Sequence, residues 1–301
     1  MTGIMLVGAN GQLGWEVARR AADDAIQCHP LDIEQVDITQ RNAVFGAVER
    51  LEPAIIVNAA AYTAVDKAES DAGTAYAVNR DGAGYLAEAC AAAHVPLIHV
   101  STDYVFDGES QTPYRETDRT APLGVYGASK LAGEEAVRQS CPNHLILRTS
   151  WLYGVHGRNF VKTMLRLARV RERVRVVGDQ HACPTSAGDL ADAILTLAGR
   201  LQSGDWPEDG FGTFHLTGQG ATTWCGLARE IFAAAAPTLG RQPEIEAITT
   251  TDYPTPARRP LHSVLDCGRI ARVHGIALRP WQPALAETVT ASLAQSPAEV
   301  S

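Results

Sequence analysis

The chain has 301 residues, 46% of them hydrophobic, so it can bury one large core or two smaller ones. Its formal net charge of -8 lacks the basic excess that binding a nucleic-acid backbone uses, which argues against nucleic acid as a partner. No apolar run approaches the ~20 residues of a membrane span, and the cysteines lack metal-ligand spacing, so we expect a soluble, cytoplasmic protein with reduced thiols and no membrane partner.

Short apolar runs alternate with helix-like stretches through the first half of the chain. Strands are expected at residues 4–7, 26–31, 54–57, 95–100 and 144–149, and helices at 12–22, 40–51, 72–92 and 127–139. This β-α alternation predicts an α/β fold built on a Rossmann-like, doubly wound parallel sheet.

The regular alternation of expected strands and helices ends after Trp151. A basic helix (158–171), a strand (174–177), a helix (187–199), the run GTFHLTG and a helix from residue 222 follow, separated by loops at 203–212 and 252–260. We interpret residues 1–152 as a dinucleotide-binding domain to which a segment of about 186–222 returns. Residues 153–301 would then form mainly a smaller, C-terminal substrate-binding lobe.

A glycine-rich segment, GANGQLG, follows the first expected strand and opens the first helix. Gly8 would permit a tight turn, Gly11 would let a pyrophosphate approach the backbone, and Gly14 would allow close packing of helix and strand. An isolated match is equally well explained as a turn without a ligand. The order strand, loop, helix favours a dinucleotide.

Asp32 ends the second expected strand. An acid at this place can accept hydrogen bonds from the ribose hydroxyls of a dinucleotide, which favours NADH over NADPH. A simple turn residue is the alternative, and the choice between the two cofactors stays open.

Tyr126 and Lys130 are four residues apart in VYGASKLAGEE and therefore share one face of a helix. A nearby ammonium would lower the phenol pKa from ~10, so Tyr126 is the candidate proton donor. Thr102, near the carboxyl edge of the sheet, is placed to hydrogen-bond a carbonyl. Taken singly, the Tyr-Lys pair is better explained by chance, and a turn or helix cap explains Thr102 equally well.

Together these motifs resemble the dTDP-4-dehydrorhamnose reductases, a family of the extended short-chain dehydrogenase/reductase superfamily. The likeness covers nearly the whole chain and includes GANGQLGWE, VNAAAYTAVDKAE, STDYVFDG, YGASKLAGE, RTSWLYG and YPTPARRP. It implies reduction of the C4 ketone of a dTDP-sugar with NADH or NADPH.

The resemblance also assigns roles to residues. Thr102, Tyr126 and Lys130 would carry the chemistry. The cofactor would be bound by Gly8, Gly11, Gln12, Leu13, Gly14, Asp32, Asp37, Ala61, Tyr62, Thr63, Tyr126 and Lys130. The sugar nucleotide would contact Thr102, Asp103 and Trp151, and Arg258 in its proline-bounded loop could bind phosphate.

Some relatives bind Mg²⁺ near a dimer interface, and Glu16, Asp189 and Glu287 stand at the matching positions. The resemblance therefore implies a magnesium site and a homodimer. Three solvated carboxylates without a metal are an equally good interpretation.

Two other functions compete. A nucleotide-sugar dehydratase or epimerase would share the glycine motif and the Tyr-Lys pair, but dehydratases of this fold read T-D-E where this chain has Tyr104. A regulatory subunit that binds dinucleotide without turnover would not need Thr102, Tyr126 and Lys130.

Overall fold

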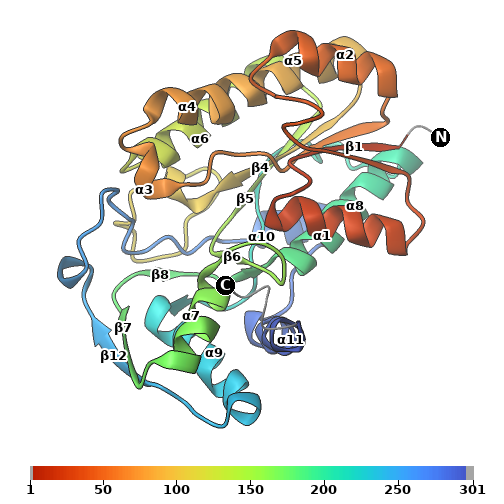
Figure 1. The fold of residues 1–301 in the computed structure, drawn as a ribbon. Helices are drawn as coiled ribbons and strands as arrows, with labels where there is room; N and C mark the ends of the chain where they lie inside the picture. Colours follow the sequence, from red (N-terminus) through yellow and green to blue (C-terminus); the bar gives the residue numbers. More distant parts are fainter. Residues whose placement is uncertain (1–2, 296–301) are drawn as a thin grey trace.

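The computed structural model describes residues 3–295, and its centre is a sheet of six parallel strands (Figure 1). Across the sheet the strands are β10 (Gly212–His215), β5 (His144–Thr149), β4 (Leu97–Thr102), β3 (Ile55–Asn58), β1 (Ile4–Val7) and β2 (Cys28–Leu31). The predicted doubly wound sheet is confirmed. The run GTFHLTG contains β10, so the chain leaves the sheet after β5, enters the second lobe, and returns to the sheet at β10.

Helices cover both faces of this sheet (Figure 1). One layer contains α1 (Gln12–Asp23), α8 (Ala187–Ser203) and α10 (Gly268–His274), and the other contains α2 (Arg41–Leu51), α5 (Ala83–Ala93) and α6 (Val125–Ser140). Ile4 and Leu6 face the first layer, whereas Met5 and Val7 face the second. Because both faces are buried, the strand is continuously apolar rather than alternating.

The helix expected at 72–92 is interrupted. It consists of α4 (Ala72–Tyr76), a π-helical turn (Ala77–Gly82) and α5. Such turns re-aim one or two side chains within a helix and often occur at functional sites. Here the turn contains Asn79, whose side chain is buried.

The second lobe packs three helices around its own apolar core (Figure 1). These are α7 (Phe160–Val170), α9 (Trp224–Leu239) and α11 (Trp281–Ala294). Three two-stranded pairs frame them: β7 (Arg173–Val177) with β12 (Glu244–Ile248), β8 (His181–Ala182) with β11 (Thr222–Thr223), and β6 (Leu152–Tyr153) with β9 (Thr185–Ser186). The sequence did not predict β12, α10 or α11.

Two further properties follow from the described residues. All the cysteines are free thiols, as expected. Within residues 3–295 no helix combines the length and apolarity that crossing a bilayer requires.

Helix α6 lies against its neighbours at two glycines. A Cβ on Gly127 would stand 2.2 Å from the Tyr104 carbonyl oxygen, and one on Gly133 would stand 2.0 Å from the Asn79 carbonyl oxygen. Because both obstacles are backbone atoms, a larger residue could be accommodated only by moving the helix.

We expect Gly133→Ala to lower the free energy of unfolding by about 1–3 kcal/mol, because the added methyl group overpacks α6 against the π-helical turn. Gly46→Ala is the matched control, since Gly46 lies on the exposed side of α2 and nothing lies within 4 Å of its Cβ position. That variant should gain up to about 1 kcal/mol from helix propensity. Urea denaturation measures both, and equal stability of the two variants would contradict the packing argument.

Candidate active site

A large cleft opens at the carboxyl ends of the sheet strands, where folds of this type bind ligands. Its volume is about 1100 Å³. Pockets for one drug-sized ligand have roughly 300–1,000 Å³, so this cleft has room for more than one small molecule. Its wall includes the glycine-rich loop, Thr102, Tyr126, Lys130 and Trp151.

The glycine-rich loop makes a tight turn and leaves the N-terminus of α1 without a capping side chain. Gly8 has a φ of +80°, and a Cβ there would lie 2.5 Å from the Ala60 nitrogen. Gly11 precedes α1 and places no side chain over its free N–H groups. Gly14 does not line the cleft, but a Cβ on it would lie 2.0 Å from the Gly8 carbonyl oxygen. Gly14 thus serves the packing of α1 on the loop.

The two acids predicted to contact the cofactor lie in the same cleft. Asp32 accepts hydrogen bonds from the backbone N–H of Asn10 (2.7 Å) and of Ile33 (2.7 Å). Asp37 accepts from the Thr39 backbone N–H (2.9 Å) and hydroxyl (2.8 Å). These bonds orient both carboxylates. Gln12, Leu13, Ala61, Tyr62 and Thr63 also line the cleft.

Asn79 holds the segment that contains Ala61, Tyr62 and Thr63. Its side chain accepts a hydrogen bond from the Tyr62 N–H (2.8 Å) and donates one to the Tyr62 carbonyl oxygen (3.1 Å). It also donates to the Ser129 hydroxyl on α6 (2.9 Å). Sequence reasoning missed this residue, because one asparagine inside a helical pattern gives no recognisable signal.

Thr102 and Asp103 sit at the end of β4 beside Tyr126. Both are buried, with exposed fractions of 6% and 2%. The Thr102 hydroxyl donates to Asp103 Oδ1 (3.1 Å), and the Ser263 hydroxyl donates to Asp103 Oδ2 (2.5 Å). Asp103 therefore links β4 to the C-terminal part of the chain.

The pKa of Tyr126 corrects a prediction. Burial raises the pKa of Tyr126 to about 12, the Thr102 hydroxyl acts against this shift, and the charge of Asp103 adds to it. The lowering expected from Lys130 is therefore wrong for this structure. At neutral pH the phenol keeps its proton.

Lys130 lines the cleft but is almost fully buried. Its ammonium donates to the Val100 carbonyl oxygen (2.6 Å), and only 2% of the residue is exposed. Burial lowers the pKa of Lys130 to about 8, and the charge of Glu134 opposes that shift. Lys130 is thus mostly charged at neutral pH and loses its proton in mildly alkaline solution.

Trp151 forms part of an aromatic wall. Its ring stacks on Trp224 with centroids 3.6 Å apart, and Phe160 packs on Trp224 at 4.6 Å. Trp151 has a φ of +43°, which is strained for a bulky residue. Trp224, which the sequence analysis missed, comes from the start of α9 and can offer a flat surface to a base or sugar.

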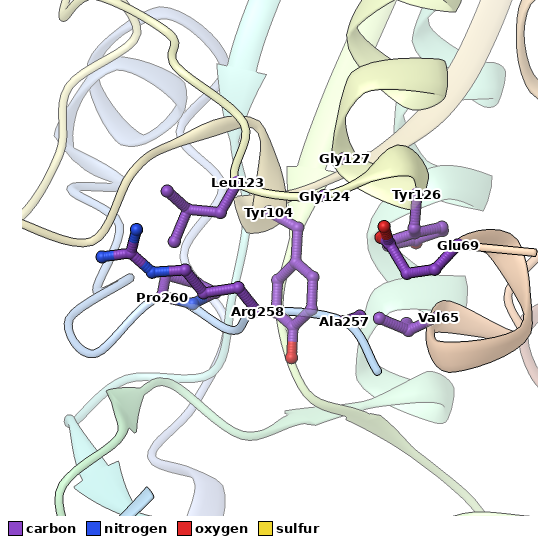
Figure 2. A pocket seen from close by; sticks show the side chains of 10 residues that line it. All are labelled: Val65, Glu69, Tyr104, Leu123, Gly124, Tyr126, Gly127, Ala257, Arg258 and Pro260. Atoms are coloured by element: carbon purple, nitrogen blue, oxygen red, sulfur yellow. The ribbon is translucent and has the colours of Figure 1, made fainter. Parts of the chain in front are cut away.

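Arg258 does not line the large cleft. Figure 2 shows it with Leu123 and Pro260 at a small pocket, with Tyr104 between this group and Glu69. Its guanidinium extends away from Tyr126 in this view. The neighbouring Arg259 pairs with Asp66 (2.8 Å). A role for Arg258 in substrate binding stays a prediction.

The predicted magnesium site is wrong, because arginines already neutralise its acids. Arg279 pairs with Asp189 (2.9 Å) and Glu287 (2.5 Å), and Glu16 pairs with Arg19 (2.9 Å). Arg279 correspondingly lowers the pKa of Glu287. Among residues 3–295 no group of three or more His, Cys, Asp or Glu is arranged to hold a metal ion. The donor set therefore does not fit Mg²⁺.

We expect neither EDTA nor added Mg²⁺ to change the Tm or oligomeric state of the protein, because the Arg279 guanidinium takes the place of an external cation. The substitution Arg279→Met should lower the free energy of unfolding by about 1 kcal/mol, the usual contribution of a partly exposed ion pair. Thermal melting and light scattering test this. A rise in Tm of the unaltered protein on adding Mg²⁺ would show that the acids do bind metal.

Asp103 makes stability depend on pH. Burial raises its pKa from 3.8 to about 7, so between those values the folded chain holds a proton that the unfolded chain has released. The Asp103 contribution to stability therefore falls as pH rises through this window. The variant Asp103→Asn has no carboxyl group at this position, so this part of the pH dependence of stability is absent from it.

Between about pH 4 and pH 7 the free energy of unfolding of the unaltered protein should fall by a few kcal/mol relative to that of Asp103→Asn. Above about pH 8 it should fall no further on this account. Urea denaturation of both proteins across a pH series measures the difference. A difference that stays constant over the window would refute the buried, protonated carboxyl.

Comparison with known proteins identifies the family of this chain. Residues 1–294 match the family model described as RmlD substrate binding domain. A dTDP-4-dehydrorhamnose reductase of Sinorhizobium fredii is 46% identical over 290 residues, covering 96% of this chain and 97% of the relative.

Two solved structures agree with this match. The dTDP-4-dehydrorhamnose reductase of Clostridium acetobutylicum has a TM-score of 0.88 at 37% identity, covering 95% of this chain and 98% of the other. That of Bacillus anthracis, solved in complex with NADP, has a TM-score of 0.89 at 34% identity, covering 96% and 99%. The chain therefore belongs to the dTDP-4-dehydrorhamnose reductase family.

Proposed function

We propose that this protein reduces the C4 ketone of dTDP-4-dehydro-L-rhamnose to dTDP-L-rhamnose, a step of dTDP-rhamnose biosynthesis. One observation supports this above all: Thr102, Tyr126 and Lys130 line the same cleft as the glycine-rich loop. A proton donor, a carbonyl-binding hydroxyl and a dinucleotide cradle are the parts that a ketone reductase needs.

The residues of the cleft fit a nicotinamide dinucleotide. The open N-terminus of α1, which follows the tight turn at Gly8, suits a pyrophosphate, and Asp32 suits a ribose. Lys130 would hold the nicotinamide ribose. When bound, NADH or NADPH supplies the hydride.

Within this assignment the protein's own residues bind the ketone and deliver a proton. The Thr102 hydroxyl would donate a hydrogen bond to the carbonyl oxygen and so polarise it. Tyr126 would give its phenolic proton to that oxygen as the alcohol forms. The raised pKa of Tyr126 suits a proton donor, because the phenol enters the reaction protonated. Asp103 and the Trp151 wall would position the sugar nucleotide.

The competing functions have weaker support. A dehydratase needs an acid where this chain has Tyr104, whose half-buried ring makes an edge contact with Tyr126 at 5.9 Å between ring centroids. A purely regulatory subunit has no use for Thr102, Tyr126 and Lys130 in one cleft. Absence of NAD(P)H oxidation with the dTDP ketosugar would favour that second alternative.

Three finer points belong to the same proposal. The Asp32 carboxylate favours NADH, whereas the Bacillus anthracis relative was solved with NADP, so kcat/KM for both cofactors decides between them. A homodimer is testable by light scattering. Residues 1–152 with 186–222 would bind the dinucleotide, and the rest of 153–301 would bind mainly the sugar nucleotide.

We expect Tyr126→Phe to lower kcat for the ketosugar about 100-fold or more, because a positioned general acid is lost. NADPH binding, measured by fluorescence, should be nearly unchanged. The matched control is Tyr253→Phe, which removes the same hydroxyl from an exposed loop residue and should keep full activity. A kcat of Tyr126→Phe close to that of the control would remove Tyr126 from the mechanism.

A further inference from the structure

The segment from residue 154 to 159, which we call the strap, crosses from the second lobe to the glycine-rich loop. The His156 ring nitrogen Nε2 donates to the Asn10 carbonyl oxygen (3.1 Å). The same ring stacks on Trp15 of α1, with centroids 5.1 Å apart and planes 6° from parallel. Asn159 donates to Gln12 Oε1 (2.8 Å). Three separate contacts thus fix the strap on the expected pyrophosphate site.

The strap brings Arg158 to the wall of the large cleft. Gly157, just before it, has a φ of +74°, and a Cβ there would lie 3.1 Å from the Gln12 side chain. The tight turn therefore depends on glycine and sets the place of the next residue. Arg158 is exposed, and within residues 3–295 it makes no ion pair.

Arg158 differs in exposure from the other positively charged residue of the cleft. The charged residues that line it are Asp32, Asp37, Asp103, Lys130 and Arg158. Lys130 is buried and donates to a backbone carbonyl oxygen. A dinucleotide and a dTDP-sugar each bring a diphosphate into a cleft with three carboxyl groups. Arg158 is the exposed cation among the residues that line the cleft, and a guanidinium binds phosphate oxygens in a bidentate manner.

We propose that Arg158, held in place by the strap, binds a ligand diphosphate in this cleft. The contacts of the strap with Asn10 and Gln12 favour the diphosphate of the dinucleotide over that of the sugar nucleotide. The proposal rests on the proposed function for the identity of these ligands. It makes Arg158 a binding residue and His156 a residue that positions it.

The test compares Arg158→Gln with Arg166→Gln. Both variants remove one exposed positive charge, but Arg166 lies on α7 outside the cleft wall. The Kd values for NADPH and for dTDP are measured separately, by fluorescence and calorimetry. We expect Arg158→Gln to raise the NADPH Kd about 10-fold, the effect of one charge-assisted hydrogen bond. The dTDP Kd and the Tm should be unchanged.

The outcomes separate the two proposals. A rise in the dTDP Kd alone would still support diphosphate binding and would identify the sugar nucleotide as its source. If Arg158→Gln and Arg166→Gln bind both probes alike, the inference is overturned. If the unaltered protein binds NADPH through Arg158 yet never oxidises it with the ketosugar, the proposed function fails and the inference stands.

A double-mutant cycle tests the role of the strap. His156→Ala removes the stacking on Trp15 and the bond to Asn10 but keeps Arg158. If the strap positions the guanidinium, His156→Ala should weaken NADPH binding several-fold in the presence of Arg158 and hardly at all in the Arg158→Gln background. Fully additive effects would show that His156 acts independently of Arg158.

Discussion

The ion pair between Glu134 and Arg148 fixes the helix that carries Tyr126 and Lys130. Glu134 on α6 accepts two hydrogen bonds from the Arg148 guanidinium on β5, at 2.8 and 2.6 Å, and neither residue exposes more than 2% of its surface. Burial raises the pKa of Glu134, but the hydrogen bonds and charge of Arg148 outweigh it and leave the pKa below its usual value. Arg138 pairs with the same carboxylate (2.6 Å), so the more costly loss is that of Glu134. It would leave the Arg148 charge buried and uncompensated, which typically costs 3–5 kcal/mol.

The same carboxylate also joins α6 to the strand that ends in Thr102. Ser101, the residue before it, donates to Glu134 Oε1 (2.6 Å). One buried group therefore connects α6, β4 and β5, and two of these elements carry the Tyr-Lys pair and the Thr102 hydroxyl. The close backbone contacts at Gly127 and Gly133 add a steric constraint in the same place. The relative positions of Thr102, Tyr126 and Lys130 are thus set mainly by buried contacts between these elements.

The sequence predicted the parts of the site that depend on local pattern. The sheet, the glycine-rich loop and the shared face of Tyr126 and Lys130 follow from periodicity and spacing, which are local properties. The raised pKa of Tyr126 was not predictable, since it depends on burial by the whole fold. Nor was the pairing of Arg279 with Asp189, which are 90 residues apart in the chain. Asn79 acquires its role only when the π-helical turn meets the Tyr62 segment.

The crossing from the sheet to the second lobe explains why both halves of the chain share one cleft. β5 ends at Thr149, and the next residue, Ser150, donates to the Cys183 carbonyl oxygen of the second lobe (2.6 Å). Trp151 follows in a strained conformation and stacks on Trp224. The strap begins only three residues later. Trp151 and the strap therefore follow closely on a strand of the main sheet, which fixes where this segment enters the cleft. The strain at Trp151 is then offset by packing that a less bulky residue would not provide.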